Sequence, residues 1–152
     1  MPHETKSNEK PSISGEAVSI LRQNGNAEAI ANGFVEDSRL ISDMGFTAKE
    51  SGDYQLAVKD FDEAIRLNHE NAYAYFHRAH AHQKLGRYER AIKDLDRVIE
   101  LNPENVAAHV NRGNAYSALG EHKRAIQDYD RAVELDPDYV LGFYNRGLAY
   151  SE

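Results

Sequence analysis

The stretch that decides the fold is Ala72–Asn105, AYAYFHRAHAHQKLGRYERAIKDLDRVIELNPEN, together with the 34 residues that follow it, Val106–Tyr139, VAAHVNRGNAYSALGEHKRAIQDYDRAVELDPDY. Aligned without a gap, the two stretches are identical at 14 of 34 positions. The same frame continues backwards to Ser38 and forwards through Val140–Glu152. A fixed period of this length indicates a row of stacked structural units, in which each unit buries its apolar face against its neighbours.

Each unit has the pattern of two helices joined by a turn. A glycine (Gly52, Gly86 or Gly120) stands where the first helix should end, and glycine adopts the left-handed conformation of such a turn without steric cost. Apolar residues then recur at helical spacing and predict a second helix in each unit. These second helices are expected at Tyr54–Leu67, Tyr88–Leu101 and His122–Leu135.

The residues before Ser38 do not follow the repeat frame. Residues 1–14 carry charges, serines and prolines with little to bury, and we interpret them as a disordered tail. Within 15–37 apolar residues recur at helical spacing. We expect an N-terminal capping helix or helices there, because stacking leaves the first unit with a bare apolar face.

The composition limits the classes of function. A net charge of −7 over 152 residues argues against a general nucleic-acid binder and against binding to an anionic membrane surface. The absence of cysteine excludes disulfides and thiolate metal sites. With 41% hydrophobic and 28% charged residues, a polar N-terminus and no apolar run of membrane-spanning length, we expect a cytoplasmic protein.

The recurring residues resemble the tetratricopeptide repeat. With Ser38 as position 1, that repeat has a bulky residue at 4, Leu-Gly at 7–8, Tyr at 11, Ala at 20, an aromatic at 24, Ala at 27 and Pro at 32. The third unit has His109, Arg112-Gly113, Tyr116, Ala125, Tyr129, Ala132 and Pro137. It departs from the pattern at position 7, which is Arg in three units.

The resemblance covers about residues 38–152 and implies the fold. We expect an all-α, right-handed α-solenoid of helix-turn-helix units. Three full repeats, 38–71, 72–105 and 106–139, are followed by a half repeat at 140–152. Small residues at positions 8, 20 and 27 should let the two helices approach closely, while bulky ones at 4, 11 and 24 fill the remaining space.

Histidines and recurring charges are the candidates for chemistry. His82, His109 and His122 fall at positions where an aromatic side chain packs. His77 and His80 are one helical turn apart without a nearby third ligand in sequence, so we expect no metal site and no cofactor. No set of nucleophile, base and orienting residue is apparent, and no phosphate-binding glycine loop, so we expect no enzyme activity.

Arginine and aspartate recur with the period. Arg78, Arg112 and Arg146 occupy position 7, and Asp60, Asp94 and Asp128 follow on the second helices. A buried arginine stem with a carboxylate partner favours a structural Arg–Asp ladder between helices. The alternative is a basic stripe that binds an acidic peptide.

The resemblance implies a peptide-binding groove lined by positions 2, 5, 6, 9 and 12 of the first helices. The candidate groove residues are Tyr73, Phe76, His77, His80, Asn111, Asn114, Tyr144 and Asn145. Asn111 and Asn145 at position 6 resemble the asparagine ladder of O-linked N-acetylglucosamine transferase arrays, where amides hold a peptide backbone. The alternative is that these two asparagines only face water.

Chaperone-binding arrays hold a C-terminal carboxylate with lysine, asparagine and arginine at fixed positions. The corresponding residues here are Ser42, Phe46, His77, Ala107 and Asn111 from the first unit. From the second unit they are Phe76, His80, Asn111, Leu141 and Asn145. Neither set has a cation, so a chaperone-tail clamp is not expected.

We therefore expect a scaffold or adaptor that docks a peptide segment or a partner helix in the groove. One alternative is self-assembly through the last helix, whose apolar residues lack a second helix to cover them. These residues are Phe143, Tyr144, Leu148 and Tyr150. Another is that the chain is a regulatory part of a longer enzyme with such repeats.

Overall fold

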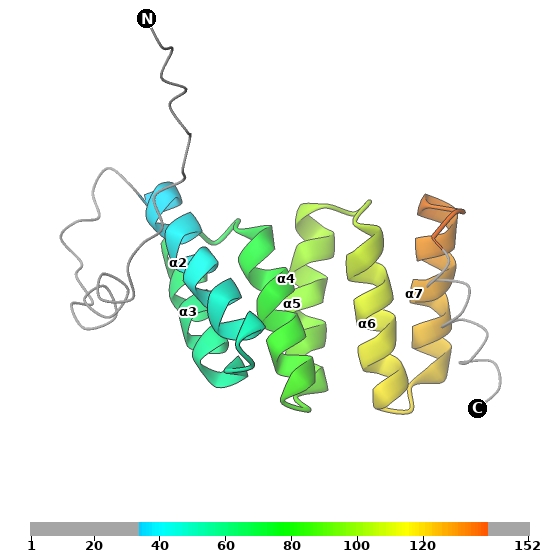
Figure 1. Cartoon of the computed structure of the whole chain (residues 1–152). Helices are drawn as coiled ribbons and strands as arrows, with labels where there is room; N and C mark the ends of the chain where they lie inside the picture. Colours follow the sequence, from blue (N-terminus) through cyan, green and yellow to red (C-terminus); the bar gives the residue numbers. More distant parts are fainter. Residues whose placement is uncertain (1–33, 140–152) are drawn as a thin grey trace, which may run out of the picture. The chain divides into compact units, whose positions relative to one another are not determined.

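The computed structural model describes residues 34–139, which form six α-helices and contain no strand (Figure 1). The helices are α2 (Phe34–Glu50), α3 (Tyr54–Leu67), α4 (Ala72–Lys84), α5 (Tyr88–Leu101), α6 (Val106–Ala118) and α7 (His122–Leu135). The three second helices have the bounds predicted from the sequence. The expected tail at 1–14, the half repeat at 140–152 and most of the capping segment lie outside the described residues.

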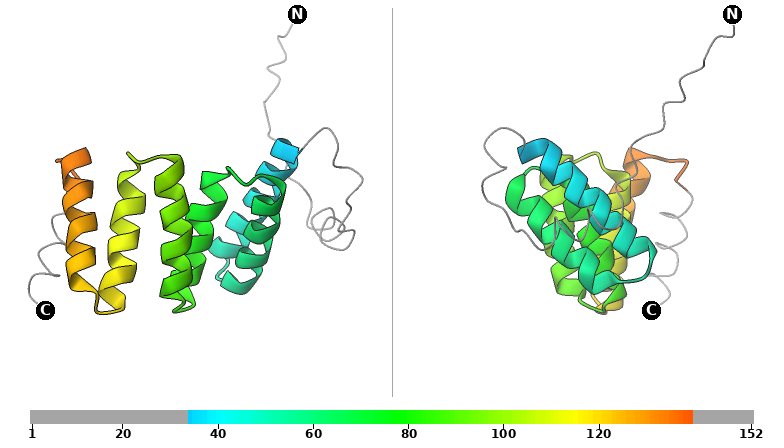
Figure 2. Two further views of the ribbon diagram at one scale, coloured as in Figure 1. Left: turned by 180° about the vertical axis from the view of Figure 1, so that it is seen from behind. Right: turned by 60° about the vertical axis from the view of Figure 1, so that its left-hand side comes forward.

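The helices pack as successive pairs in chain order. The pairs α2–α3, α4–α5 and α6–α7 form three units, and α3 packs against α4 as α5 packs against α6. Figures 1 and 2 show the described helices following one another along a single row. The described part of the chain is therefore an all-α helical repeat solenoid, as expected.

The first helices of the units form the inner layer of this row. Helix α2 contacts α4, and α4 contacts α6, whereas α3, α5 and α7 make fewer contacts with one another. A row whose members lie closer together on one side curves towards that side, which produces the extended concave surface of a solenoid. The inner face is thus the exposed side of α2, α4 and α6.

Each unit turns at a glycine with a positive φ. The φ angles are +83° at Gly52, +70° at Gly86 and +75° at Gly120. A Cβ atom at any of the three would meet nothing within 4 Å, so the backbone conformation and not the available space requires glycine. This confirms the predicted end of each first helix.

Small residues allow the two helices of a unit to lie close together. The position-24 side chains Phe61, Leu95 and Tyr129 are at most 2% exposed. A Cβ atom at Gly113 would lie 2.6 Å from Cε1 of Tyr129, and one at Gly45 would lie 2.9 Å from Cε1 of Phe61. The predicted alternation of small and bulky residues therefore determines how these pairs pack.

Candidate functional site

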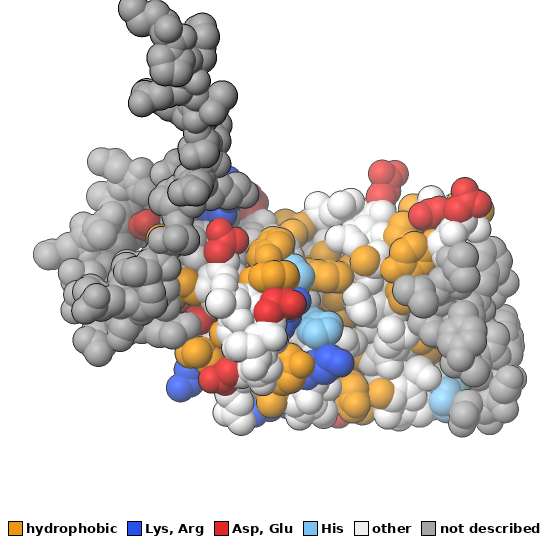
Figure 3. Space-filling view, in the orientation of Figure 1, with side chains coloured by type: hydrophobic (Ala, Val, Ile, Leu, Met, Phe, Trp, Pro, Cys, Tyr) orange, Lys and Arg blue, Asp and Glu red, His pale blue; other side chains and the backbone are white. Residues whose placement is uncertain are grey.

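An aromatic cluster occupies the inner face between α2 and α4. We use this name for Phe46, Phe61, Tyr73, Phe76 and His77. The His77 ring centroid lies 4.2 Å from that of Tyr73, 5.2 Å from Phe46 and 5.4 Å from Phe76, each with an edge-on ring. In Figure 3, hydrophobic and histidine side chains lie together near the middle of the row of helices.

The repeat frame explains why these rings meet. Tyr73, Phe76 and His77 have the spacing of one helical face on α4. Phe46 reaches them from α2, and the buried Phe61 ring of α3 stacks beneath His77 with centroids 6.1 Å apart. The cluster therefore rests on the core, yet Tyr73 is 43% exposed and is the one exposed large hydrophobic side chain of the described residues.

His77 is a neutral side chain at pH 7. Burial first, and then the nearby Lys49 and His80, lower its pKa to about 4, against the opposing effect of Glu50. The pKa of His80 is lowered as well, by burial and then by Lys49 and Lys84. Both imidazoles therefore add polarity to the inner face without adding charge.

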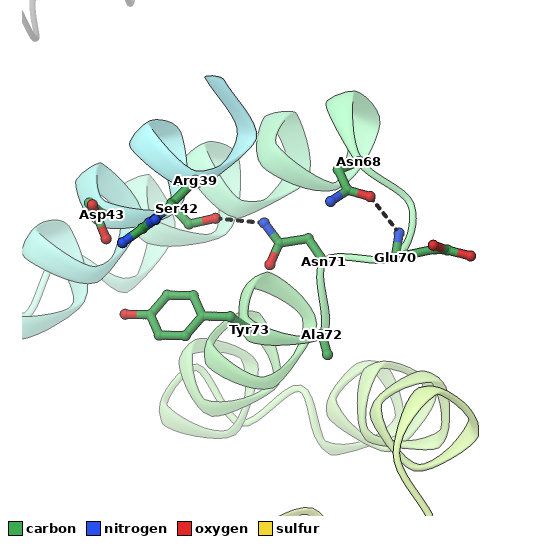
Figure 4. A pocket seen from close by; sticks show the side chains of 8 residues that line it. All are labelled: Arg39, Ser42, Asp43, Asn68, Glu70, Asn71, Ala72 and Tyr73. Atoms are coloured by element: carbon green, nitrogen blue, oxygen red, sulfur yellow. Dashed lines mark hydrogen bonds between the residues drawn. The ribbon is translucent and has the colours of Figure 1, made fainter. Parts of the chain in front are cut away.

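A depression of about 500 Å³ lies beside the cluster, between α2, the α3–α4 turn and the start of α4. Figure 4 shows its lining residues, Arg39, Ser42, Asp43, Asn68, Glu70, Asn71, Ala72 and Tyr73. Asn71 donates from Nδ2 to Ser42 Oγ at 3.0 Å across it. The depression and the Tyr73 ring form one continuous surface.

Helix α6 continues the inner face with amide side chains. Asn111 is half-buried, and its backbone carbonyl accepts a hydrogen bond from Gln83 Nε2 of α4 at 2.8 Å. Asn114 is exposed, and its Oδ1 accepts from the Tyr129 hydroxyl at 2.8 Å. The first contact holds α6 against α4, and the second joins α6 to α7 through the Asn114 amide.

Two family models match this chain. The model described as "Tetratricopeptide repeat" matches residues 77–140, and the one described as "TPR repeat" matches residues 49–86. The chain belongs to the tetratricopeptide repeat family. Together the matches cover residues 49–140, which include α3 to α7 and only the end of α2, and over these residues the sequence pattern and the observed helices agree.

Solved tetratricopeptide domains resemble the described structure. The Arabidopsis OM64 TPR domain has a TM-score of 0.76 at 28% identity and covers 78% of this chain and 98% of that chain. The second TPR domain of human RPAP3 in complex with the HSP70 peptide SGPTIEEVD has a TM-score of 0.72 at 25% identity, covering 78% and 97%. The second TPR of Spaghetti (RPAP3) bound to the HSP90 peptide SRMEEVD has a TM-score of 0.66 at 29% identity, covering 72% and 99%. A search among curated proteins gave no match.

Two position-7 arginines of this tetratricopeptide array, Arg78 and Arg112, lie within the described residues, and both connect units. Arg112 donates from Nε and Nη2 to Asp128 at 2.9 and 2.6 Å, and from Nη1 to Asp96 at 2.7 Å. Arg78 makes the same pattern with Asp94 and Asp62. Each arginine therefore bridges its own unit and the preceding one, which supports the structural ladder over a basic stripe. Sequence reasoning missed the second carboxylates, Asp62 and Asp96, although they recur with the period.

The histidines outside the aromatic cluster mainly pack. His82 and His109 are each 5% exposed, as expected for their positions in the frame. His109 Nε2 lies 3.0 Å from the Pro103 carbonyl oxygen and Nδ1 lies 3.4 Å from Asp128 Oδ1. Within residues 34–139, no three side chains of the types that bind metals gather into a site.

In the same range, no helix combines the length and hydrophobicity needed to cross a bilayer.

The structure brings together part of the predicted groove. Tyr73, Phe76 and His77 meet in the aromatic cluster, with His80 on the same helix. Asn111 and Asn114 lie on the next inner helix. Tyr144 and Asn145 lie outside the described residues, as do the other residues expected for self-association. Sequence reasoning did not include Phe46 among the groove residues, although position 9 of the first unit marks it.

Proposed function

We propose that this chain is a protein-interaction module that binds an extended segment of a partner protein on the inner face of α2, α4 and α6. Tetratricopeptide domains are in general interaction modules, and two similar domains hold bound peptides, from HSP70 in human RPAP3 and from HSP90 in Spaghetti. The observation that carries the proposal is the exposed Tyr73 ring on the aromatic cluster, beside a depression of about 500 Å³.

This surface has the properties of a binding site. An aromatic side chain offers a large contact area with few rotatable bonds, and aromatic residues supply much of the binding energy at interfaces. The buried Phe61 ring supports the cluster from below, so little conformational freedom is lost on binding. The depression beside Tyr73 gives a bound chain room to continue across α2.

The test is a set of binding measurements on the whole chain. Peptides selected by the chain from a random display library should lose at least about tenfold in affinity for the variant Tyr73→Ala, Phe76→Ala, Asn111→Ala. The control variant Lys93→Ala, Gln127→Ala changes exposed residues of α5 and α7 and should bind normally. Circular dichroism must show unchanged helicity in both. Equal affinity of the triple variant and the control would contradict this location of the site.

A further inference from the structure

The inner face carries little charge, although the chain as a whole has a net charge of −7. Its α4 and α6 positions 2, 5, 6, 9 and 12 hold no lysine, arginine, aspartate or glutamate. These residues are Tyr73, Phe76, His77, His80, Gln83, Ala107, Val110, Asn111, Asn114 and Ser117. Charge at the equivalent positions is confined to α2, which has Arg39, Asp43 and Lys49, and Lys49 Nζ lies 3.1 Å from Glu50 Oε1.

Building on the proposed function, we propose that the inner face selects an uncharged, internal segment of its partner. A bulky apolar side chain of that segment contacts Tyr73 and Phe76, and the adjoining main chain follows α6. The ligand class is thus a neutral extended peptide, and a free acidic C-terminus is not required.

The apolar contact follows from the arrangement of the rings. The Tyr73 and Phe76 rings both contact the His77 ring edge-on and belong to one cluster. One face of the neighbouring Phe46 ring already has a cation, because Lys49 Nζ lies 4.2 Å from its centroid. An aliphatic or aromatic side chain from the partner removes the exposed Tyr73 surface from water without burying a further charge.

The same face disfavours acidic ligands. The peptides bound to RPAP3 domains, SGPTIEEVD and SRMEEVD, both end in Glu-Glu-Val-Asp. Transfer of carboxylates onto α4 and α6 of this chain would remove water without supplying a lysine or arginine at the inner-face positions of these two helices. Asp43 and Glu50 add repulsion, since after burial these two carboxylates raise the pKa of Tyr73.

Helix α6 suits a peptide main chain. Side-chain amides donate to a carbonyl and accept from an N–H, so they match any sequence. Asn111 lies on the same face of α6 as the smaller Ala107 and Ser117, and Asn114 lies there too, although its Oδ1 already accepts from the Tyr129 hydroxyl. The small neighbours leave room for the backbone to approach, so α6 contributes affinity with little preference for a particular side chain.

The experiment selects short random peptides with the full chain in two display formats, one with a free peptide C-terminus and one with the peptide inside a linker. Both formats should yield binders that share a bulky apolar residue. By calorimetry, the affinity of a selected synthetic peptide should change less than about twofold between roughly 50 and 500 mM salt. The peptide SRMEEVD serves as the acidic probe and should bind at least about tenfold more weakly.

The possible outcomes separate the two proposals. Binders found only in the free C-terminal format, or affinity that falls about tenfold or more with salt, would overturn the neutral internal ligand but leave the groove in place. Tight binding of SRMEEVD would do the same. The proposed function itself would be contradicted by a library that yields no binder. It would also be contradicted by binders whose affinity for the Tyr73→Ala, Phe76→Ala variant equals their affinity for the wild type.

Discussion

Asn71 performs two structural tasks with one side chain. Its Oδ1 accepts from the Ala74 backbone N–H at 2.9 Å and so caps α4. Its Nδ2 donates to the hydroxyls of Ser38 at 2.8 Å and Ser42 at 3.0 Å, both of which are buried in α2. The cap of the second unit is thereby fastened to the first unit.

We predict that Asn71→Ala destabilises the protein by about 2–3 kcal/mol, which combines a lost helix cap with two lost hydrogen bonds to buried hydroxyls. Asn105 is the matched control. It caps α6 through the Ala108 N–H at 3.0 Å, but Ala72 and Phe76 replace Ser38 and Ser42 in its unit. Asn105→Ala should cost about 1 kcal/mol. Equal losses in urea unfolding would show that the serine contacts contribute nothing.

Residue contacts of this kind were the least predictable from the sequence. The repeat frame placed Tyr73, Phe76 and His77 on one helix face, and the structure brings them together. The frame does not state how side chains of different units meet. The Asn71 contacts and the approach of Phe46 to His77 depend on how far α2 lies from α4, which the packing of both helices on α3 determines.

Helix α4 carries three histidines that the fold keeps neutral. Burial is the largest cause of the lowered pKa of His77, His80 and His82. For His82, the nearby Arg78, Arg87 and Arg90 add to burial while Asp94 opposes it. Below the ordinary histidine pKa of about 6.5, the unfolded chain therefore binds more protons at these sites than the folded chain does.

This difference in bound protons determines how the stability changes with pH. Because the unfolded state takes up the extra protons, stability falls as pH falls, from about 6.5 towards the folded pKa, which for His77 is about 4. We predict a lower urea midpoint at about pH 5 than at about pH 7.5. His82→Tyr, which introduces the residue found at Tyr116 of the next unit, should reduce this loss. The same pH dependence in the variant would show that His82 does not contribute.

The helices themselves were largely predictable, because turn glycines and apolar spacing repeat three times in one register. The difference lies at the start of α2, which begins at Phe34, four residues ahead of the frame and inside the expected capping segment. Ser38 could have been the N-cap of α2, with the helix beginning directly after it. Its hydroxyl instead donates to the Ala64 carbonyl at 2.7 Å and packs fully buried, so nothing at Ser38 stops α2 from extending backwards.

At the scale of the whole array, the Arg–Asp ladder links one unit to the next. In a solenoid, stability is the sum of what each unit contributes and what each interface adds. Arg112 contributes to the stability of its own unit through Asp128 and to the interface with the preceding unit through Asp96. Burial alone would raise the pKa of Asp128, but the contacts from Arg112 and His109 bring it below its usual range.

We predict that Arg112→Gln lowers the free energy of unfolding by about 3 kcal/mol, because the buried Asp128 carboxylate loses its main cationic partner. Loss of the link to Asp96 should also weaken coupling between units and lower the slope of the urea transition. Arg131→Gln is the control. It removes only an exposed i, i+3 pair with Glu134 and should cost less than about 0.5 kcal/mol. An Arg112 variant with an unchanged slope would show that the units are coupled through apolar packing alone.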